Sequence, residues 1–159
     1  MTGTEGAPLK GGGRGEGAVS KTRVPAVDDW FTMDDEPALL GKRGTETGAY
    51  FFPPDQAFSR HPGAPTEPLE DVKLSRRGRV WSWTTNHYEP PDPYVAPDPF
   101  VPYTVVAVEL VEEQMVVLGP LAPGADPASL TAGTEVELTL GTLYEDDDNE
   151  YVMWGWQPV

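Results

Sequence analysis

The fold is decided by two segments of the sequence, LEDVKLSRRGRVWSWTTNHY at residues 69–88 and YTVVAVELVEEQMVVL at residues 103–118. Both are dense in β-branched and aromatic side chains that alternate with a period of two, which is typical of β-strands. Trp81 and Trp83, for example, alternate with small hydroxylic residues. We therefore expect residues 69–88 to form a bent strand or a hairpin, and residues 103–118 to form two strands joined by a tight turn.

Further strands are predicted on both sides of this unit. Residues 39–54 are expected to form two short strands about a turn, in which Gly44 or Gly48 supplies any positive φ that the turn requires. Toward the C-terminus, TEVELTL at residues 134–140 alternates cleanly, and a last strand covers residues 151–156. The connection before them is predicted to be a loop with one helical turn. Five strands with one short helical insertion favour a small all-β barrel, closed or nearly closed, of the OB type.

The composition indicates how the chain is divided. Of its 159 residues, 18 are Pro and 17 are Gly, so short strands and long loops are expected rather than a helical bundle. Residues 1–28 contain few apolar side chains and are predicted to be a disordered tail. Residues 29–68 form a second segment that ends in a linker, and residues 69–159 form the barrel. The sequence lacks a signal-peptide pattern and a bilayer-length apolar run, which favours a cytoplasmic protein.

Charge is distributed unevenly along the chain. The formal net charge is -15, and all eleven Lys and Arg residues lie at or before Arg79. Residues 80–159 carry fourteen Asp and Glu and no Lys or Arg. A nucleic-acid backbone would be repelled by this half of the chain, and binding would release no counterions there. The charge distribution therefore weighs against the base-stacking function that many OB barrels have.

Several segments, in their order and spacing, resemble one known family. They are TGAYFFPP at residues 47–54, GRVWSWTT at 78–85, PYTVVAVEL at 102–110 and LG at 118–119. These segments resemble the DUF35 family of OB-fold proteins, which is associated with acyl-CoA metabolism. The resemblance covers residues 30–158 and implies a rubredoxin-like zinc ribbon followed by an OB barrel. It also implies partnership with enzymes of the thiolase superfamily.

One branch of that family is the most similar. The insertion of prolines and aromatic residues at 90–102, together with residues 38–54, most resembles the DUF35 partner of actinobacterial steroid side-chain aldolases, which are lipid-transfer-like thiolases. In that branch the module can also be the tail of a MaoC-like hydratase subunit. The resemblance thus implies a hetero-oligomer with a thiolase-like or lipid-transfer-like protein, with a MaoC-like hydratase as a further partner and acyl-CoA reached through the partner.

The chain departs from the family pattern at the zinc ribbon. Where the family carries its first pair of cysteines, this chain has Gly44 and Thr47, and near the second pair it has Phe58 and His61. One histidine cannot hold a structural zinc ion, which needs four ligands. We therefore predict a cysteine-less remnant of the ribbon without metal or other cofactor, in which Phe51, Phe52 and Phe58 pack in place of the ion.

The sequence carries no recognisable catalytic motif. His61 and His87 are the only histidines, the chain has no cysteine, and no nucleophile motif accompanies them. The acidic run at residues 145–150 lacks the alternating pattern of a calcium loop, so a solvated hairpin tip explains it better. No catalytic residue and no metal ligand is therefore assigned, and catalysis by this chain alone is not expected.

One basic group is the candidate for binding phosphate, and it consists of Lys73, Arg76, Arg77 and Arg79. These side chains could contact the phosphates of coenzyme A, or an acidic patch of a partner, through charge-assisted hydrogen bonds. A solvated turn explains the same residues slightly better, because no glycine-rich phosphate loop accompanies them.

Aromatic residues supply the candidate partner interface. Alternation places about half of the aromatic rings of the strands in the core and leaves the rest for contacts with another protein. The segment PPDPYVAPDPFVP at residues 90–102 is stiffened by its prolines and would lose little entropy on docking. The predicted interface residues are Trp83, His87, Tyr88, Tyr94, Phe100 and Tyr103.

These observations lead to one expected function and one alternative. The expected function is that of an accessory subunit of a thiolase-superfamily complex, a steroid side-chain retro-aldolase, which stabilises the catalytic partner and helps to shape its acyl-CoA site. The alternative is a module that binds acyl-CoA or acyl carrier protein without a partner.

Overall fold

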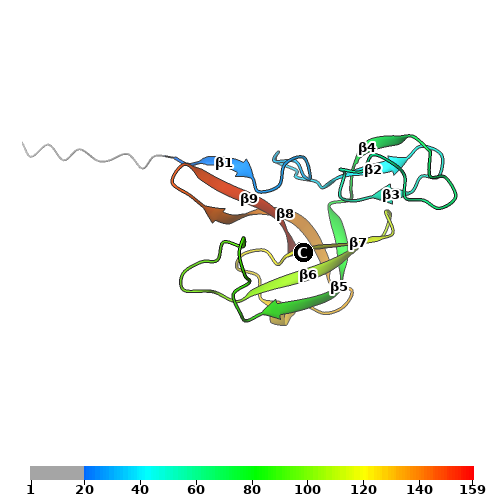
Figure 1. Ribbon diagram of the computed structural model, residues 1–159. Coiled ribbons are helices and arrows are strands. Elements are labelled where there is room, and N and C mark those ends of the chain that lie inside the picture. The colour runs from blue at the N-terminus through cyan, green and yellow to red at the C-terminus, as the bar shows by residue number, and fades with distance from the viewer. Residues whose placement is uncertain (1–19) are drawn as a thin grey trace, which may run out of the picture.

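The computed structural model describes residues 20–159, which fold almost entirely as β-strands (Figure 1). The strands are β1 (Thr22–Pro25), β2 (Leu40–Gly44), β3 (Tyr50–Phe51), β4 (Leu69–Lys73), β5 (Arg77–Asn86), β6 (Tyr103–Leu110), β7 (Met115–Pro120), β8 (Glu135–Glu145) and β9 (Asn149–Pro158). Between β7 and β8 lies one 3-10 turn, Pro127–Ser129, where the sequence predicted a helical turn. In this part of the chain no helix is long and apolar enough to cross a membrane.

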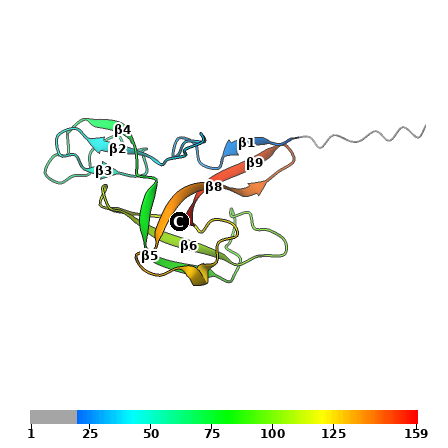
Figure 2. The ribbon, with the colours of Figure 1, turned by 180° about the vertical axis from the view of Figure 1, so that it is seen from behind.

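The larger sheet has six strands in the order β1-β9-β8-β5-β6-β7. The sheet is strongly curled (Figures 1 and 2). Its two sides meet where Leu121, just after β7, forms a bridge with Trp156 on β9. The Ala122 amide donates a second hydrogen bond to the Trp156 carbonyl oxygen over 2.9 Å. Strands β5 to β9 thus form the curled, OB-type barrel that the sequence predicted.

The core of the barrel is built from the inward positions of these strands. On β6, Val106, Val108 and Leu110 are fully buried, whereas Glu109 between them is exposed. Trp156 is the largest side chain that is completely buried. Because a shift of one residue would move each of these side chains to the other face, burial fixes the register of the strands. Their burial contributes about 1.5–3 kcal/mol for each large apolar side chain.

The smaller sheet has three strands in the order β3-β2-β4 and lies at one end of the barrel (Figure 1). β2 and β3 form a short hairpin, as expected for residues 39–54. Its turn uses Gly48 at a φ of 71°, a conformation that glycine adopts without strain. This sheet occupies the part of the chain that was predicted to be a ribbon remnant. Its descent from a zinc ribbon stays a prediction.

Residues 69–88 do not form the single bent strand or hairpin that the sequence predicted. β4 pairs with β2 in the smaller sheet, whereas β5 pairs with β6 and β8 in the larger one. The smaller sheet thus extends past residue 69, the predicted start of the barrel domain. The chain changes sheets here because Leu74 is buried in the core and the Ser75 amide donates to the buried carboxylate of Glu113 in the β6–β7 turn.

The N-terminal segment is ordered earlier than predicted. The expected tail covers residues 1–28, of which residues 1–19 lie outside the described residues. Strand β1, in the remaining part of that tail, pairs in parallel with β9. Two ion pairs accompany this ladder. Lys21 lies 2.7 Å from Glu145, and Arg23 lies 3.5 Å from Glu150. The backbone edge of β9 thus orders a segment that has few apolar side chains of its own.

Candidate functional site

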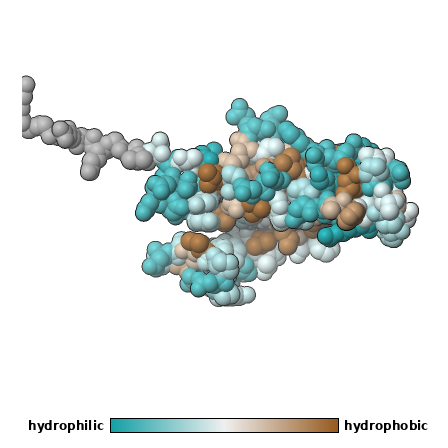
Figure 3. Space-filling model, turned by 45° about the horizontal axis from the view of Figure 1, so that its top comes forward, coloured by the Kyte–Doolittle hydropathy of each residue, from teal (hydrophilic) through white to brown (hydrophobic). Residues whose placement is uncertain are grey.

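An apolar cleft opens between two arms of the barrel. One arm consists of β6, β7 and the proline-rich loop before β6, and the other consists of β8 and β9. The cleft has a volume of about 390 Å³, within the usual range of ligand pockets. Figure 3 shows hydrophobic side chains along the hollow that separates the lower lobe from the rest of the molecule. The main lining residues are Tyr94, Val101, Tyr103, Leu118, Leu143 and Trp154.

The cleft exists because β5 and β8 are paired over a short distance. Their ladder joins Arg77–Arg79 to Glu135–Glu137, and the last backbone bonds between the two segments link Val80 to residues 133 and 134. Directly afterwards a register shift between Val80 and Ser82 marks an irregularity in β5. Such bulges bend a strand and increase its twist. The two arms therefore diverge beyond this point and leave the cleft between them.

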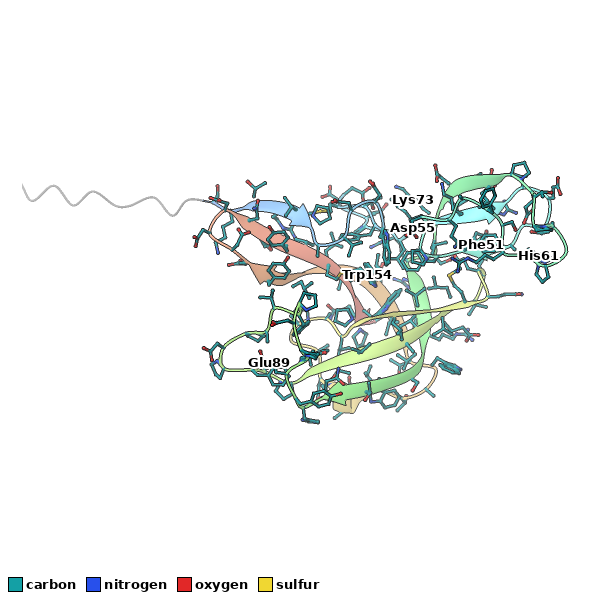
Figure 4. The ribbon with its side chains drawn as sticks, viewed as in Figure 1. Phe51, Asp55, His61, Lys73, Glu89 and Trp154 are labelled. Atoms are coloured by element: carbon teal, nitrogen blue, oxygen red, sulfur yellow. The ribbon has the colours of Figure 1, made fainter. Side chains whose placement is uncertain are left out.

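Trp154 of β9 lines the cleft, and Trp156, two positions further along the strand, is completely buried. Trp154 is 4% exposed, and its indole Nε1 donates a hydrogen bond to the Leu118 carbonyl oxygen over 3.1 Å. Gly119 lies against both indoles, and a Cβ atom there would lie 2.9 Å from Nε1 of Trp154 and of Trp156. A side chain at this position would therefore displace the rings. Figure 4 shows Trp154 near the middle of the molecule, on the inner side of β9.

An aromatic wall, consisting of Tyr94, Phe100 and Tyr103, borders the cleft on the side of the proline-rich loop. The rings of Tyr94 and Tyr103 stack with their centroids 5.7 Å apart, and Phe100 meets Tyr103 edge-on at 6.4 Å. Burial raises the pKa of Tyr94 above its ordinary value, and the neighbouring Tyr103 contributes in the same direction. These contacts hold the loop against the start of β6.

The cleft is uncharged inside and acidic at its borders. Its lining, among residues 20–159, includes no charged side chain. The proline-rich loop carries Glu89, Asp92 and Asp98, and the turn at the tip of the other arm carries the acidic run 145–150. Figure 4 places Glu89 on the loop side. This potential repels phosphate groups and attracts a basic surface.

The predicted interface residues separate into two groups. Three of them form the aromatic wall, in which Tyr94 and Tyr103 line the cleft and Phe100 packs against Tyr103. The other three lie on β5 or just after it and do not line the cleft, these being Trp83, His87 and Tyr88. Trp83 is 38% exposed and Tyr88 is 72% exposed, so both are accessible to another protein. Whether any of the six contacts a partner stays a prediction.

Sequence reasoning missed two leucines of the cleft. Leu118 is 61% exposed and Leu143 is 41% exposed, although each belongs to a strand of the barrel. Alternation had indicated which positions share a face of each strand. It could not indicate that Leu118, on the outward face of β7, and Leu143, near the end of β8, line the same cleft.

The basic group lies on β4, on β5 and between them. Arg76 is the most constrained member, because its Nε donates to the Pro37 carbonyl oxygen over 2.9 Å and its Nη1 lies 3.3 Å from the Glu137 carboxylate. Lys73 and Arg77 face carboxylates at 3.7 and 3.3 Å. Neighbouring carboxylates thus compensate much of the positive charge. Binding of coenzyme A phosphates, or of a partner, by Lys73, Arg76, Arg77 and Arg79 stays a prediction.

No catalytic arrangement is present around the histidines of the described chain. His87 is exposed, and the His61 Nδ1 accepts a hydrogen bond from the Gly63 amide over 3.1 Å. Figure 4 shows His61 at the far end of the smaller sheet, remote from the cleft. Asp146 in the acidic turn accepts hydrogen bonds from the amides of Asn149 and Asp148, which lower its pKa. These bonds explain the acidic run as a hairpin turn.

The positions that correspond to zinc ligands do not fit a metal ion. Gly44 has no side chain, Phe58 is 77% exposed, and the Thr47 hydroxyl is engaged with the carboxylate of Glu67. Within residues 20–159 no group of three His, Cys, Asp or Glu side chains is placed to hold a metal. The expected packing of Phe58 in place of an ion is wrong, because that ring points into solvent. The absence of any cofactor stays a prediction.

Comparisons with known proteins agree with this architecture. Residues 71–141 match the family model described as the ChsH2 C-terminal OB-fold domain. A DUF35 domain-containing scaffold protein from Methanocaldococcus jannaschii is 27% identical over 134 residues, covering 82% of this chain and 87% of that protein. A chain of the solved Ltp2-ChsH2(DUF35) aldolase superposes with a TM-score of 0.57 at 23% identity, over 76% of this chain and 84% of that one.

The fold defines a class of protein, and the comparisons show a likeness to one family. The class is an all-β protein with an OB-fold barrel and a small three-stranded sheet built from β2, β3 and β4. The chain is similar to proteins of the DUF35 family, and its residues 71–141 match the OB-fold domain of ChsH2.

Proposed function

We propose that this chain is an accessory, non-catalytic subunit of a thiolase-superfamily complex that acts on acyl-CoA thioesters, namely a steroid side-chain retro-aldolase. The catalytic partner would be thiolase-like or lipid-transfer-like and would cleave the carbon-carbon bond. This chain would stabilise the partner and help to shape its acyl-CoA site. Both would act in the cytoplasm.

The observation that carries the proposal is the apolar cleft with its aromatic wall. Exposed apolar and aromatic side chains that gather on one surface mark sites of protein association. Leu118 and Leu143 are exposed at the cleft, and Tyr94 and Tyr103 are held beside it by stacking. A surface of this kind can anchor a partner without supplying chemistry of its own.

The relatives support the same role. One of them is a scaffold protein and the other belongs to an aldolase that contains a DUF35 component. Neither histidine of this chain has a nucleophile motif beside it in the sequence. A supporting function therefore agrees with both the relatives and the residues of the chain.

The experiment that tests the proposal is a pull-down of the tagged chain from its native host grown on sterol. We expect a thiolase-like protein to be retained in a fixed ratio, and the complex to elute as one species of defined size. The purified complex should cleave a steroid acyl-CoA thioester by retro-aldol reaction, whereas this chain alone should not. Recovery of the chain without a partner, under conditions in which it is folded, would count against the accessory role.

A second function is favoured by the volume of the cleft. A space of about 390 Å³ is large enough for part of an acyl group, so the chain could bind acyl-CoA or acyl carrier protein alone. Calorimetry of the isolated chain with a medium-chain acyl-CoA distinguishes the two functions. Tight binding without a partner would favour this alternative. We expect weak or no binding, because the borders of the cleft are acidic.

A further inference from the structure

The turns at the outer end of the smaller sheet are joined by one buried carboxylate, that of Glu67. Its side chain is almost completely buried, with a residue exposure of 4%, and that of Ser59 beside it is 6%. A buried carboxylate is costly unless its charge is compensated by hydrogen bonds or by a cation. No ion pair to Glu67 is found within residues 20–159, so hydrogen bonds must provide the compensation.

The carboxylate receives hydrogen bonds from two turns that are distant in the sequence. From the β2–β3 turn, the amides of Glu46 and Thr47 donate to Oε2 over 3.1 and 2.9 Å, and the Thr47 hydroxyl donates to Oε1 over 2.8 Å. From the second turn, the Ser59 hydroxyl donates to Oε1 over 2.8 Å. Ser59 Oγ in turn accepts from the His61 amide over 3.1 Å.

The backbone around the carboxylate is shaped to receive it. Successive amides such as those of Glu46 and Thr47 form a concave anion site when a turn points them at one atom. At Gly44 an added Cβ atom would overlap with all three atoms of the carboxylate group. The glycine is therefore required by the position of Glu67, since its own φ is not in the left-handed region.

These are also the two turns where the resemblance stated for the sequence implies the ligand pairs of a zinc ribbon. The first pair of positions is Gly44 and Thr47, and the second pair is near Phe58 and His61. Glu67 packs on Gly44, accepts from Thr47, and is linked to His61 through Ser59. The carboxylate thus connects the same two turns that a metal ion would connect.

We propose that the Glu67 carboxylate replaces a structural metal ion in this chain, and that it holds the smaller sheet together through hydrogen bonds from both turns. The linkage is metal-free and depends on the ionised state of one side chain. This inference concerns the smaller sheet and does not rest on the proposed accessory function.

Hydrogen exchange on the full chain tests the proposal, with Glu67→Gln as the principal variant. The amide of Gln would place a donor where the Oε atoms now only accept. We expect exchange in peptides covering residues 44–48 and 59–61 to become at least about tenfold faster. Glu46→Gln is the matched control, because its side chain is exposed in the same turn, and it should exchange like the unmodified chain.

Metal dependence is measured on the same samples. After dialysis against zinc and then buffer, the unmodified chain should contain no stoichiometric zinc by elemental analysis. Added chelator should leave exchange in both turns unchanged. Stoichiometric zinc, or a chelator effect on these peptides, would overturn the proposal. Exchange in Glu67→Gln that equals that of the control would overturn it as well.

A milder pair of variants keeps the test decisive if Glu67→Gln does not fold. Ser59→Ala removes one donor, and should accelerate exchange in the first turn, at residues 44–48, which Ser59 does not contact directly. Gly44→Ala should destabilise the unmodified chain more than it destabilises a Glu67→Ala background, in which the overlapping carboxylate is gone. Equal effects of Gly44→Ala in both backgrounds would show that the carboxylate does not occupy this position.

Discussion

Trp154 on β9 donates a hydrogen bond from its indole Nε1 to the carbonyl oxygen of Leu118 on β7, across 3.1 Å and 36 positions of sequence. This bond joins the two arms of the barrel directly under the cleft. The same Leu118 presents its side chain to solvent at the cleft, 61% exposed. One residue of β7 therefore takes part both in closing the barrel and in forming the candidate interface.

The contribution of this bond to stability can be measured by substitution. Trp154→Phe keeps an aromatic ring but removes the donor, so we expect a loss of about 1 kcal/mol in the free energy of unfolding. Trp154→Ala also creates a cavity and should cost about 3–5 kcal/mol. Urea unfolding followed by fluorescence provides both values. Trp81→Phe, at a ring that is 66% exposed, should change stability by less than about 0.5 kcal/mol. Equal effects of Trp154→Phe and Trp81→Phe would contradict this account.

A charge at the cleft should weaken the complex without unfolding the chain. Leu118→Asp places a carboxylate in an apolar contact, and we expect the Kd for the partner to rise at least about tenfold, or about 1.4 kcal/mol. Val111→Asp is the control, because Val111 is 55% exposed in the turn at the other end of the β6–β7 hairpin. It should bind as tightly as the unmodified chain. Similar losses in both variants would place the interface elsewhere.

The stiffness of the proline-rich loop should contribute to binding. Replacing residues 91–99 with a Gly-Ser segment of equal length removes Tyr94 from the aromatic wall and increases the entropy lost on docking. We expect weaker binding by calorimetry, with an unchanged unfolding midpoint, because no residue of this segment belongs to the core cluster. Tyr94→Ala alone separates the two effects, since it keeps the prolines. If both variants bind the partner as tightly as the unmodified chain, the loop is not part of the interface.

The acidic borders of the cleft predict how association responds to salt. A partner that binds there should present a basic surface, and its association rate constant should fall when the ionic strength is raised from about 0.05 to 0.5 M. Stopped-flow mixing at several salt concentrations measures this dependence. Replacing Asp92 and Asp98 with Asn should flatten it. A rate that increases with salt would indicate an acidic partner surface.

Acid should loosen the smaller sheet through Glu67. The Thr47 amide, followed by the Ser59 and Thr47 hydroxyls and the Glu46 amide, lowers the pKa of Glu67 from 4.5 to about 2. Since the folded pKa lies below the unfolded one, this carboxylate stabilises the fold fully above about pH 4.5, and the stabilisation is lost as the pH falls toward 2. The difference in hydrogen exchange between the unmodified chain and Glu67→Gln should therefore shrink over that interval. A constant difference from pH 7 to pH 2.5 would contradict the assignment.

The barrel could be predicted from sequence because apolar residues alternate along most of each strand. Trp154 and Trp156 are two positions apart and both point inward, as the alternation of β9 required. β4 and β1 were placed wrongly for a related reason. Alternation predicts that residues 69–73 form a strand, but it does not predict which strand they pair with. Residues 22–25 are ordered by backbone pairing with β9, and backbone pairing does not require a particular pattern of side chains.

The candidate site was predictable only where its residues are adjacent in the sequence. Tyr94, Phe100 and Tyr103 lie on or beside one proline-rich loop, and the structure brings them together. Leu118 and Leu143 become neighbours of this wall through the curl of the sheet. Glu67 was missed because a single glutamate between two prolines resembles a loop residue, and its donors lie 8, 20 and 21 positions away.

The short ladder between β5 and β8 determines how the two arms of the barrel are joined. Three residue pairs there, and the bridge from Leu121 to Trp156, connect two arms that each have a longer ladder of their own. The two arms thus resemble the jaws of a clamp, each held by its own long ladder and joined at one end by this short one. Core side chains from both jaws, among them Val117 and Trp156, belong to one cluster, so a wider mouth would have to separate core contacts as well as backbone hydrogen bonds.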